Sequence, residues 1–137
     1  MYLTVELFFV CNVMPFSITV PSKAPDSFSL NAKNSASIEA SWQLPPADGR
    51  NGIIRGFRLF YKRKSSSWSS LTINKRSTLT KVVSGLDEYT EYEFQVLAFT
   101  SKGDGPKSDR KSATTKEDSK KSEITITYTF IYCYGGL

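Results

Sequence analysis

Every second residue from Tyr92 to Ala98 is apolar, and this alternation constrains the fold more than any other part of the chain. Successive side chains of an extended strand point to opposite faces, so the pattern predicts a strand with one buried face. A strand of this kind is not stable alone; it needs partner strands and a second layer to cover its apolar side. The core is therefore expected to be built from β-sheets.

Further short segments show the same alternation, with Trp42 and Phe57 on the apolar faces of two of them. The intervening segment 44–52 contains two prolines and two glycines, so it is a loop and not a central strand. No segment of useful length has a helical period. Seven strands are expected, at residues 28–32, 38–43, 54–64, 68–73, 79–83, 91–99 and 107–114. This arrangement predicts an all-β, antiparallel sandwich of about 100 residues.

The residues that usually perform catalysis or bind metals are scarce. Histidine is absent from the whole chain, which removes the commonest general base and the commonest transition-metal ligand. The two cysteines, Cys11 and Cys133, lie near opposite ends and match neither a zinc knuckle nor a disulfide framework. No nucleophile stands beside a recognisable base. We therefore expect no enzymatic activity, no metal and no cofactor.

The formal net charge of +5 would suit an anionic partner. The longest basic run is Lys62, Arg63 and Lys64, and strand geometry sends the outer two to one face and the middle one to the other. Antiparallel pairing with the strand at 91–99 would bring Glu91 and Glu93 opposite these lysines and compensate their charge. Nucleic acid is therefore not expected, while heparin or another anionic glycan stays an alternative ligand.

Composition divides the chain into three parts. Residues 1–20 are apolar but contain Glu6 and Pro15, and no basic residue precedes the apolar run, so we expect a lead-in that is signal-like or disordered. Residues 21–118 hold all of the expected strands and form the predicted domain. Residues 119–137 begin polar and end in a β-prone stretch, which we expect to lie outside the domain.

The motifs around Trp42 and Tyr92 resemble those of a known family. Trp42 is followed by two prolines and by NGIIRGFRLFY at 51–61, and Leu86 precedes YEFQVLA at 92–98 and a glycine-rich turn. This pattern resembles the fibronectin type III domain, an immunoglobulin-like sandwich of seven strands. It is similar to the repeats of the sidekick, DSCAM, contactin and receptor tyrosine phosphatase families. Glu88 departs from the family, which often has proline there.

The resemblance implies structural roles for the aromatic residues of these motifs. Trp42 would fill the space between the sheets. Tyr92 would form a tyrosine corner, with its ring inward and its hydroxyl bonded to backbone a few residues upstream. The predicted core consists of Trp42, Phe57, Leu59, Tyr61, Leu86, Tyr92, Phe94 and Val96.

Four outward side chains at one end of the predicted sheet form a candidate partner surface. They are Arg58, Phe60, Leu97 and Phe99. An exposed apolar patch with an arginine at its rim has the composition of a protein interface.

A second candidate is the turn formed by Lys102, Gly103 and Asp104. It resembles the Lys-Gly-Asp tripeptide that integrins recognise, with Asp104 completing a metal site on the receptor. Turn geometry alone also explains the glycines of this segment.

These features predict a protein-binding and spacer module of a cell-surface or extracellular adhesion or receptor protein, one repeat of a longer tandem array. Its partners would be a protein ligand or adjacent fibronectin or immunoglobulin-type modules, and it would meet a membrane only through a parent receptor. An intracellular, cytoplasmic scaffold module of the same fold is one alternative. An anionic-glycan binder is the other.

Overall fold

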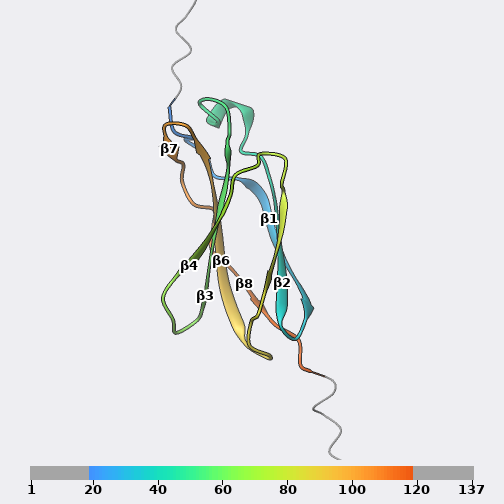
Figure 1. The fold of residues 1–137 in the computed structure, drawn as a ribbon. Helices are drawn as coiled ribbons and strands as arrows, with labels where there is room; N and C mark the ends of the chain where they lie inside the picture. The colour runs from blue at the N-terminus through green and yellow to red at the C-terminus, as the bar shows by residue number, and fades with distance from the viewer. Residues whose placement is uncertain (1–18, 119–137) are drawn as a thin grey trace, which may run out of the picture.

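The computed structural model describes residues 19–118, which form two antiparallel sheets packed face to face (Figure 1). The predictions for residues 1–18 and 119–137 lie outside the described residues. The elements are β1 (Asp26–Asn34), β2 (Ser37–Gln43), η1 (Ala47–Gly49), β3 (Gly56–Arg63), β4 (Ser69–Ile73), β5 (Thr80–Ser84), β6 (Glu91–Thr100), β7 (Gly103–Asp104) and β8 (Lys111–Thr114). The predicted all-β sandwich is confirmed, and β1 to β6 begin and end within two residues of the predicted strands.

The two sheets have different sizes. One has the order β1-β2-β5, and the other has β4-β3-β6, with β7 and β8 both pairing the far side of β6. The described chain enters at one end of the sandwich and leaves at the opposite end (Figure 1). We call these the entry end and the exit end.

The strand predicted at 107–114 is shorter in the structure, where only β8 at Lys111–Thr114 is a strand, and this corrects the predicted bounds. Gly105 N donates to Ala98 O at 2.9 Å, and Ser108 N donates to Val96 O at 2.7 Å. The Ser108 hydroxyl then accepts from Val96 N at 3.0 Å, in the place of a backbone carbonyl. Because a side chain supplies this acceptor, the segment follows β6 without regular strand geometry until β8 begins.

The core lies between the sheets, with the rings of Trp42 and Phe57 in contact at a centroid distance of 5.4 Å. Seven of the eight predicted core residues are buried. The exception is Tyr61, which is partly buried and stacks on Phe94 at 5.9 Å. Burying large aromatic side chains between two sheets is the main stabilising term of a domain this small.

The predicted tyrosine corner is present at the exit end. The Tyr92 hydroxyl accepts from the backbone N–H of Asp87 at 3.0 Å and donates to the Asp87 carboxylate at 3.2 Å. The buried Thr115 completes a clamp, since its hydroxyl donates to Asp87 O at 2.6 Å and accepts from Thr90 N at 3.0 Å. The loop between β5 and β6 is therefore held from both sides, although it has Glu88 where the family often has proline.

We expect Tyr92→Phe to lower the free energy of unfolding by about 1–3 kcal/mol, because the Asp87 amide would lose its acceptor. Tyr61→Phe is the matched control, since the Tyr61 hydroxyl makes no hydrogen bond within residues 19–118. Urea denaturation of the two variants and the parent chain measures both effects. Equal losses in the two variants would contradict the role assigned to the corner.

Candidate functional site

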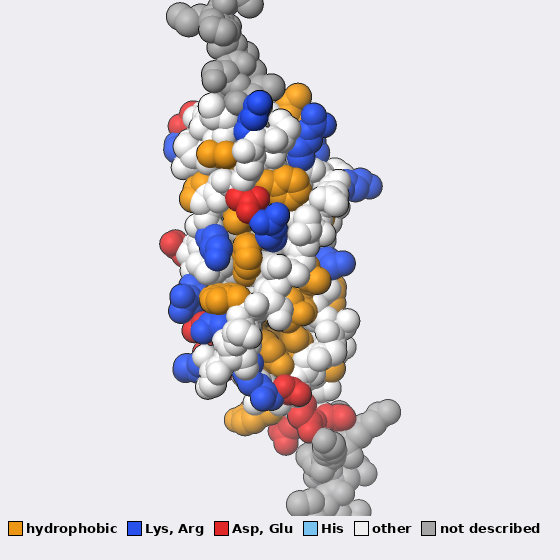
Figure 2. Space-filling view, turned by 60° about the vertical axis from the view of Figure 1, so that its left-hand side comes forward, with side chains coloured by type: hydrophobic (Ala, Val, Ile, Leu, Met, Phe, Trp, Pro, Cys, Tyr) orange, Lys and Arg blue, Asp and Glu red, His pale blue; other side chains and the backbone are white. Residues whose placement is uncertain are grey.

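Two aromatic rings, of which that of Trp68 is exposed and that of Phe60 half-buried, lie close to three basic side chains on the outer face of the larger sheet. We call this surface the cation–aromatic face; it consists of Phe60, Lys62, Trp68, Lys107 and Arg110. Phe60 and Lys62 come from β3, Trp68 directly precedes β4, and the other two come from the segment between β7 and β8. Figure 2 shows lysine and arginine side chains interleaved with apolar ones on the side of the molecule that it presents.

The basic groups of this face lie over its rings. Lys107 Nζ is 4.1 Å from the centroid of the Phe60 ring. The Trp68 ring has Lys62 Nζ at 5.2 Å, Arg110 Cζ at 5.5 Å and Lys107 Nζ at 6.0 Å. A contact of this type contributes about 0.5–1 kcal/mol at an exposed site. Together they restrict the position of an indole ring that is still 36% exposed.

One carboxylate anchors two of these three basic side chains. Glu93 Oε2 lies 3.0 Å from Lys62 Nζ and 3.5 Å from Arg110 Nη1, and its side chain is largely covered. An ion pair that is partly shielded from water is less screened than one at the open surface. Glu93 therefore restrains Lys62 and Arg110 relative to β6.

Trp68 was not predicted as a site residue. It was predicted only to begin the strand at 68–73, within a serine-rich segment. Its proximity to the basic run at 62–64 was the available signal. The contacts with Lys107 and Arg110 depend on the folded sheet and could not be foreseen.

The predicted patch of Arg58, Phe60, Leu97 and Phe99 is only partly exposed. The register pairs Arg58 with Leu97 and Gly56 with Phe99, so these residues do share one end of the face. However, Leu97 is only 3% exposed, and its predicted exposure was wrong. The reason is that β6 is a central strand here, flanked by β3 and by the segment that follows β7.

Phe99 has a packing role within that end of the sheet. A Cβ atom added at Gly56 would lie 2.9 Å from Phe99 Cζ and 2.0 Å from the Ile73 carbonyl oxygen. The phenyl ring therefore packs over bare glycine backbone, and it is half-buried. Of the four predicted residues, Phe60 alone belongs to the cation–aromatic face.

The Lys102-Gly103-Asp104 turn lies at the entry end. Asp104 belongs to β7 and forms an ion pair with Arg58. Gly103 has a φ of 139°, a conformation that favours glycine. The integrin hypothesis stays a prediction, and the carboxylate that it requires already has a partner inside the domain.

The predicted charge compensation between β3 and β6 is confirmed. Besides the Lys62–Glu93 pair, Lys64 Nζ lies 3.0 Å from Glu91 Oε2. The hydrogen bond from Lys64 lowers the pKa of the Glu91 carboxyl, with a further contribution from Ser112. The same bond raises the pKa of the Lys64 amine.

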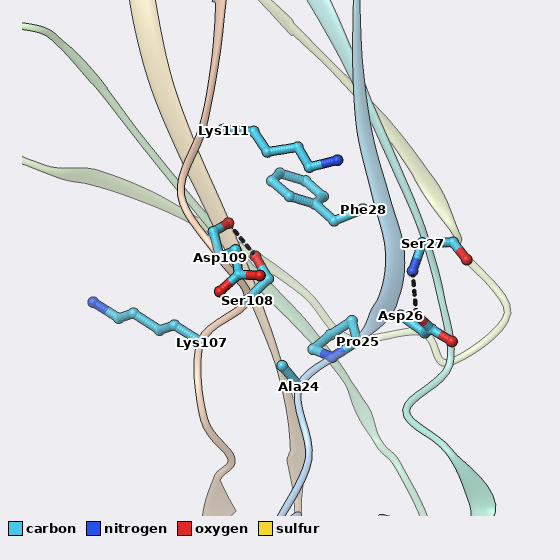
Figure 3. Close-up of a pocket in the computed structure, with 9 residues that line it drawn as sticks. All are labelled: Ala24, Pro25, Asp26, Ser27, Phe28, Lys107, Ser108, Asp109 and Lys111. Atoms are coloured by element: carbon cyan, nitrogen blue, oxygen red, sulfur yellow. Dashed lines mark hydrogen bonds between the residues drawn. The ribbon is translucent and has the colours of Figure 1, made fainter.

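A hollow of about 310 Å³ opens between the start of β1 and the segment that leads into β8 (Figure 3). The Lys111 side chain lies beside the Phe28 ring at its edge, while Lys107 points away. The Ser108 hydroxyl donates to the Asp109 carbonyl oxygen at 3.1 Å. Of the two serine hydroxyls in the lining, that of Ser108 therefore bonds to backbone and not to a side chain.

The described residues contain neither a metal-binding cluster nor a membrane-spanning helix. Within 19–118, no three acidic, cysteine or histidine side chains are close enough to share a metal ion. In the same part of the chain, no helix has the length and apolar character required to cross a bilayer.

Comparison with known proteins agrees with this geometry. The family model of the fibronectin type III domain matches residues 23–114. Neogenin of Rattus norvegicus is 43% identical over 100 residues, which cover 72% of this chain and 7% of neogenin. Cell adhesion molecule Dscam2 of Drosophila melanogaster is 36% identical over 111 residues, covering 78% of this chain and 5% of Dscam2. The chain thus spans less than a tenth of these relatives.

The solved structure of the third fibronectin III domain of human KIAA0343 protein has the same fold. Its TM-score is 0.68 at 26% identity, covering 74% of this chain and 88% of that domain. The resemblance that was inferred from the Trp42 and Tyr92 motifs is confirmed by the family model and by the relatives.

We expect Glu91→Gln to destabilise the domain at pH 7 and to have progressively less effect as the pH falls. A carboxyl whose pKa is lowered on folding stabilises the fold when the pH is above its ordinary pKa, which is 4.5 for Glu91. This stabilisation is lost as the pH falls through the pKa that the carboxyl has in the folded domain. Urea denaturation of both chains between pH 7 and pH 2.5 measures the difference. Glu39→Gln is the control for the loss of a paired carboxylate elsewhere in the domain, because Glu39 pairs with Lys33 on the other sheet. A destabilisation by Glu91→Gln that does not change with pH would contradict this account.

Proposed function

The chain belongs to the fibronectin type III family, and on that premise we propose that it is a protein-binding and spacer module of a cell-surface or extracellular adhesion or receptor protein. It works by contact and not by catalysis. The observation that carries the proposal is the cation–aromatic face, where Trp68 and Phe60 are bracketed by three basic side chains.

The composition of this face supports a protein ligand. Tryptophan and arginine are enriched among the residues that dominate the free energy of protein association. A side chain that is ordered before binding also loses less conformational entropy when the partner arrives. Trp68 satisfies both conditions, since its ring is exposed and is contacted by Lys62 and Arg110.

The distribution of charge argues against an anionic glycan as the main ligand. Glycan binding of the heparin type needs several basic groups whose charge is not already neutralised. Here Lys62 and Arg110 share Glu93, and Lys64 pairs with Glu91. Lys107 is the one basic member of the cation–aromatic face without an ion pair in the described part of the chain.

The spacer role is supported by the position of the two ends. The described chain enters and leaves at opposite ends of the sandwich (Figure 1). The matched relatives are more than ten times longer than the matched segment, and one of them is named as a cell adhesion molecule. A module between two neighbours would leave its outer sheet face open to a ligand.

The test is a binding screen of the tetramerised full chain against a panel of expressed cell-surface ectodomains. We expect at least one ectodomain to bind and Trp68→Ala to weaken that binding about tenfold or more, as for a central interface residue. Val82→Ala is the matched control, because Val82 is 45% exposed on the outer side of the other sheet.

Three outcomes would contradict the proposal. These are the absence of binding to any ectodomain, binding of Trp68→Ala equal to that of the parent chain, and an equal loss of binding in both variants. Treatment of the ectodomains with heparin-degrading enzymes separates the glycan alternative, because binding through heparin-like chains would be lost.

A further inference from the structure

A small apolar hollow lies at the entry end of the domain. Its volume is about 120 Å³, and its lining consists of Leu44, Arg50, Gly52, Ile53, Ile54 and Arg76. Ile53, at the edge of the hollow, is 53% exposed. The loop before β3 and the loop between β4 and β5 together form this hollow.

Basic side chains form the rim of the hollow. Arg50 Nε donates to the Pro45 carbonyl oxygen at 2.7 Å, which positions the guanidinium. Arg76 makes no ion pair within residues 19–118. An apolar hollow with two arginines at its rim suits an aromatic side chain that has carboxylates beside it.

The exit end presents such a side chain. Tyr89 is 77% exposed, the most exposed large apolar residue among those described. Its φ is 47°, a left-handed conformation that bulky residues rarely adopt. Its backbone N–H donates to the Lys116 carbonyl oxygen at 3.3 Å, and the Thr115 clamp holds the adjacent Thr90. The ring is thus projected from a firmly held loop.

The two ends also differ in charge. Glu88 precedes Tyr89, and Glu117 follows Lys116, to whose carbonyl Tyr89 is bonded. In Figure 2 acidic side chains gather where the described chain leaves, and basic ones are grouped at the opposite end. Opposite charges at the two ends favour a head-to-tail approach and disfavour contact between like ends.

We propose that a second copy of this chain docks head to tail, with Tyr89 of one copy in the hollow between Arg50, Ile53 and Arg76 of the next. Glu117, which follows the Lys116 carbonyl that Tyr89 contacts, then faces the arginine rim. The proposal rests on the spacer part of the proposed function, because it specifies how modules of this kind meet end to end. It does not involve the cation–aromatic face.

The contact is expected to be weak. One end of a small domain buries less than the roughly 1,200 Å² typical of stable complexes. Dissociation constants on the order of 0.1–1 mM correspond to such contacts. Within a single chain of modules, short linkers give effective concentrations of about millimolar, so a weak end-to-end contact would be occupied.

Sedimentation velocity of the full chain between about 0.05 and 1 mM tests the proposal. A head-to-tail contact does not close on itself, so the sedimentation coefficient should keep rising with concentration. We expect Tyr89→Asn and Arg76→Glu each to weaken self-association about tenfold, and 0.5 M NaCl to weaken it in the parent chain. Asparagine tolerates the left-handed conformation at this position. Val82→Ala should associate like the parent chain.

Mixing the two variants provides the decisive comparison. The Tyr89→Asn chain keeps an intact hollow, and the Arg76→Glu chain keeps an intact Tyr89, so an equimolar mixture should form dimers and nothing longer. A monomeric parent chain, a mixture that stays monomeric, or variants that associate like the parent would overturn the proposal. Near-UV circular dichroism verifies that both variants are folded. Since the ectodomain screen does not depend on end-to-end contact, failure here and failure of the proposed function are distinguishable.

Discussion

The fold of the domain depends above all on strand β6, which is paired along both of its edges. β6 pairs with β3 along one edge and with β7 and β8 along the other, while Phe94, Val96 and Ala98 point inward and are inaccessible to solvent. Tyr92 at its start ties the loop from β5 to the core through the Asp87 amide. The projected loop at the exit end leads directly into this deeply anchored strand, and the cation–aromatic face is tied to it through Glu93.

The same strand separates the side surface of the domain from its ends. Its outward residues Glu91 and Glu93 form ion pairs on this side surface. Glu93 pairs with Lys62 and Arg110, and Glu91 pairs with Lys64. Its preceding loop presents Tyr89 at the exit end, and its last residue, Thr100, bonds through its hydroxyl to the Thr19 carbonyl oxygen at the entry end. Because side and ends are distinct surfaces, the proposed ligand contact and the proposed end-to-end contact would use different residues.

Period-two alternation and a few family motifs predicted the sandwich, the bounds of six strands and the tyrosine corner, since these depend on local pattern and on burial. The exposure of Leu97 was predicted wrongly, because alternation tells which face a side chain takes and not which neighbours cover it. The last strand was misjudged because the Ser108 hydroxyl replaces a backbone acceptor, an exchange that composition does not reveal. Trp68 and Tyr89 were missed as surface residues because their positions depend on loops meeting across the fold.

The function proposed for the cation–aromatic face depends on its being ordered before a partner binds. The direct test is the ¹⁵N relaxation of the Trp68 indole N–H in the free full chain. Three cationic groups lie within 6.0 Å of the centroid of this ring. We therefore expect an order parameter for the indole N–H close to the value of about 0.85 found for rigid backbone. An order parameter below about 0.6 would show a freely moving ring and would contradict the claim.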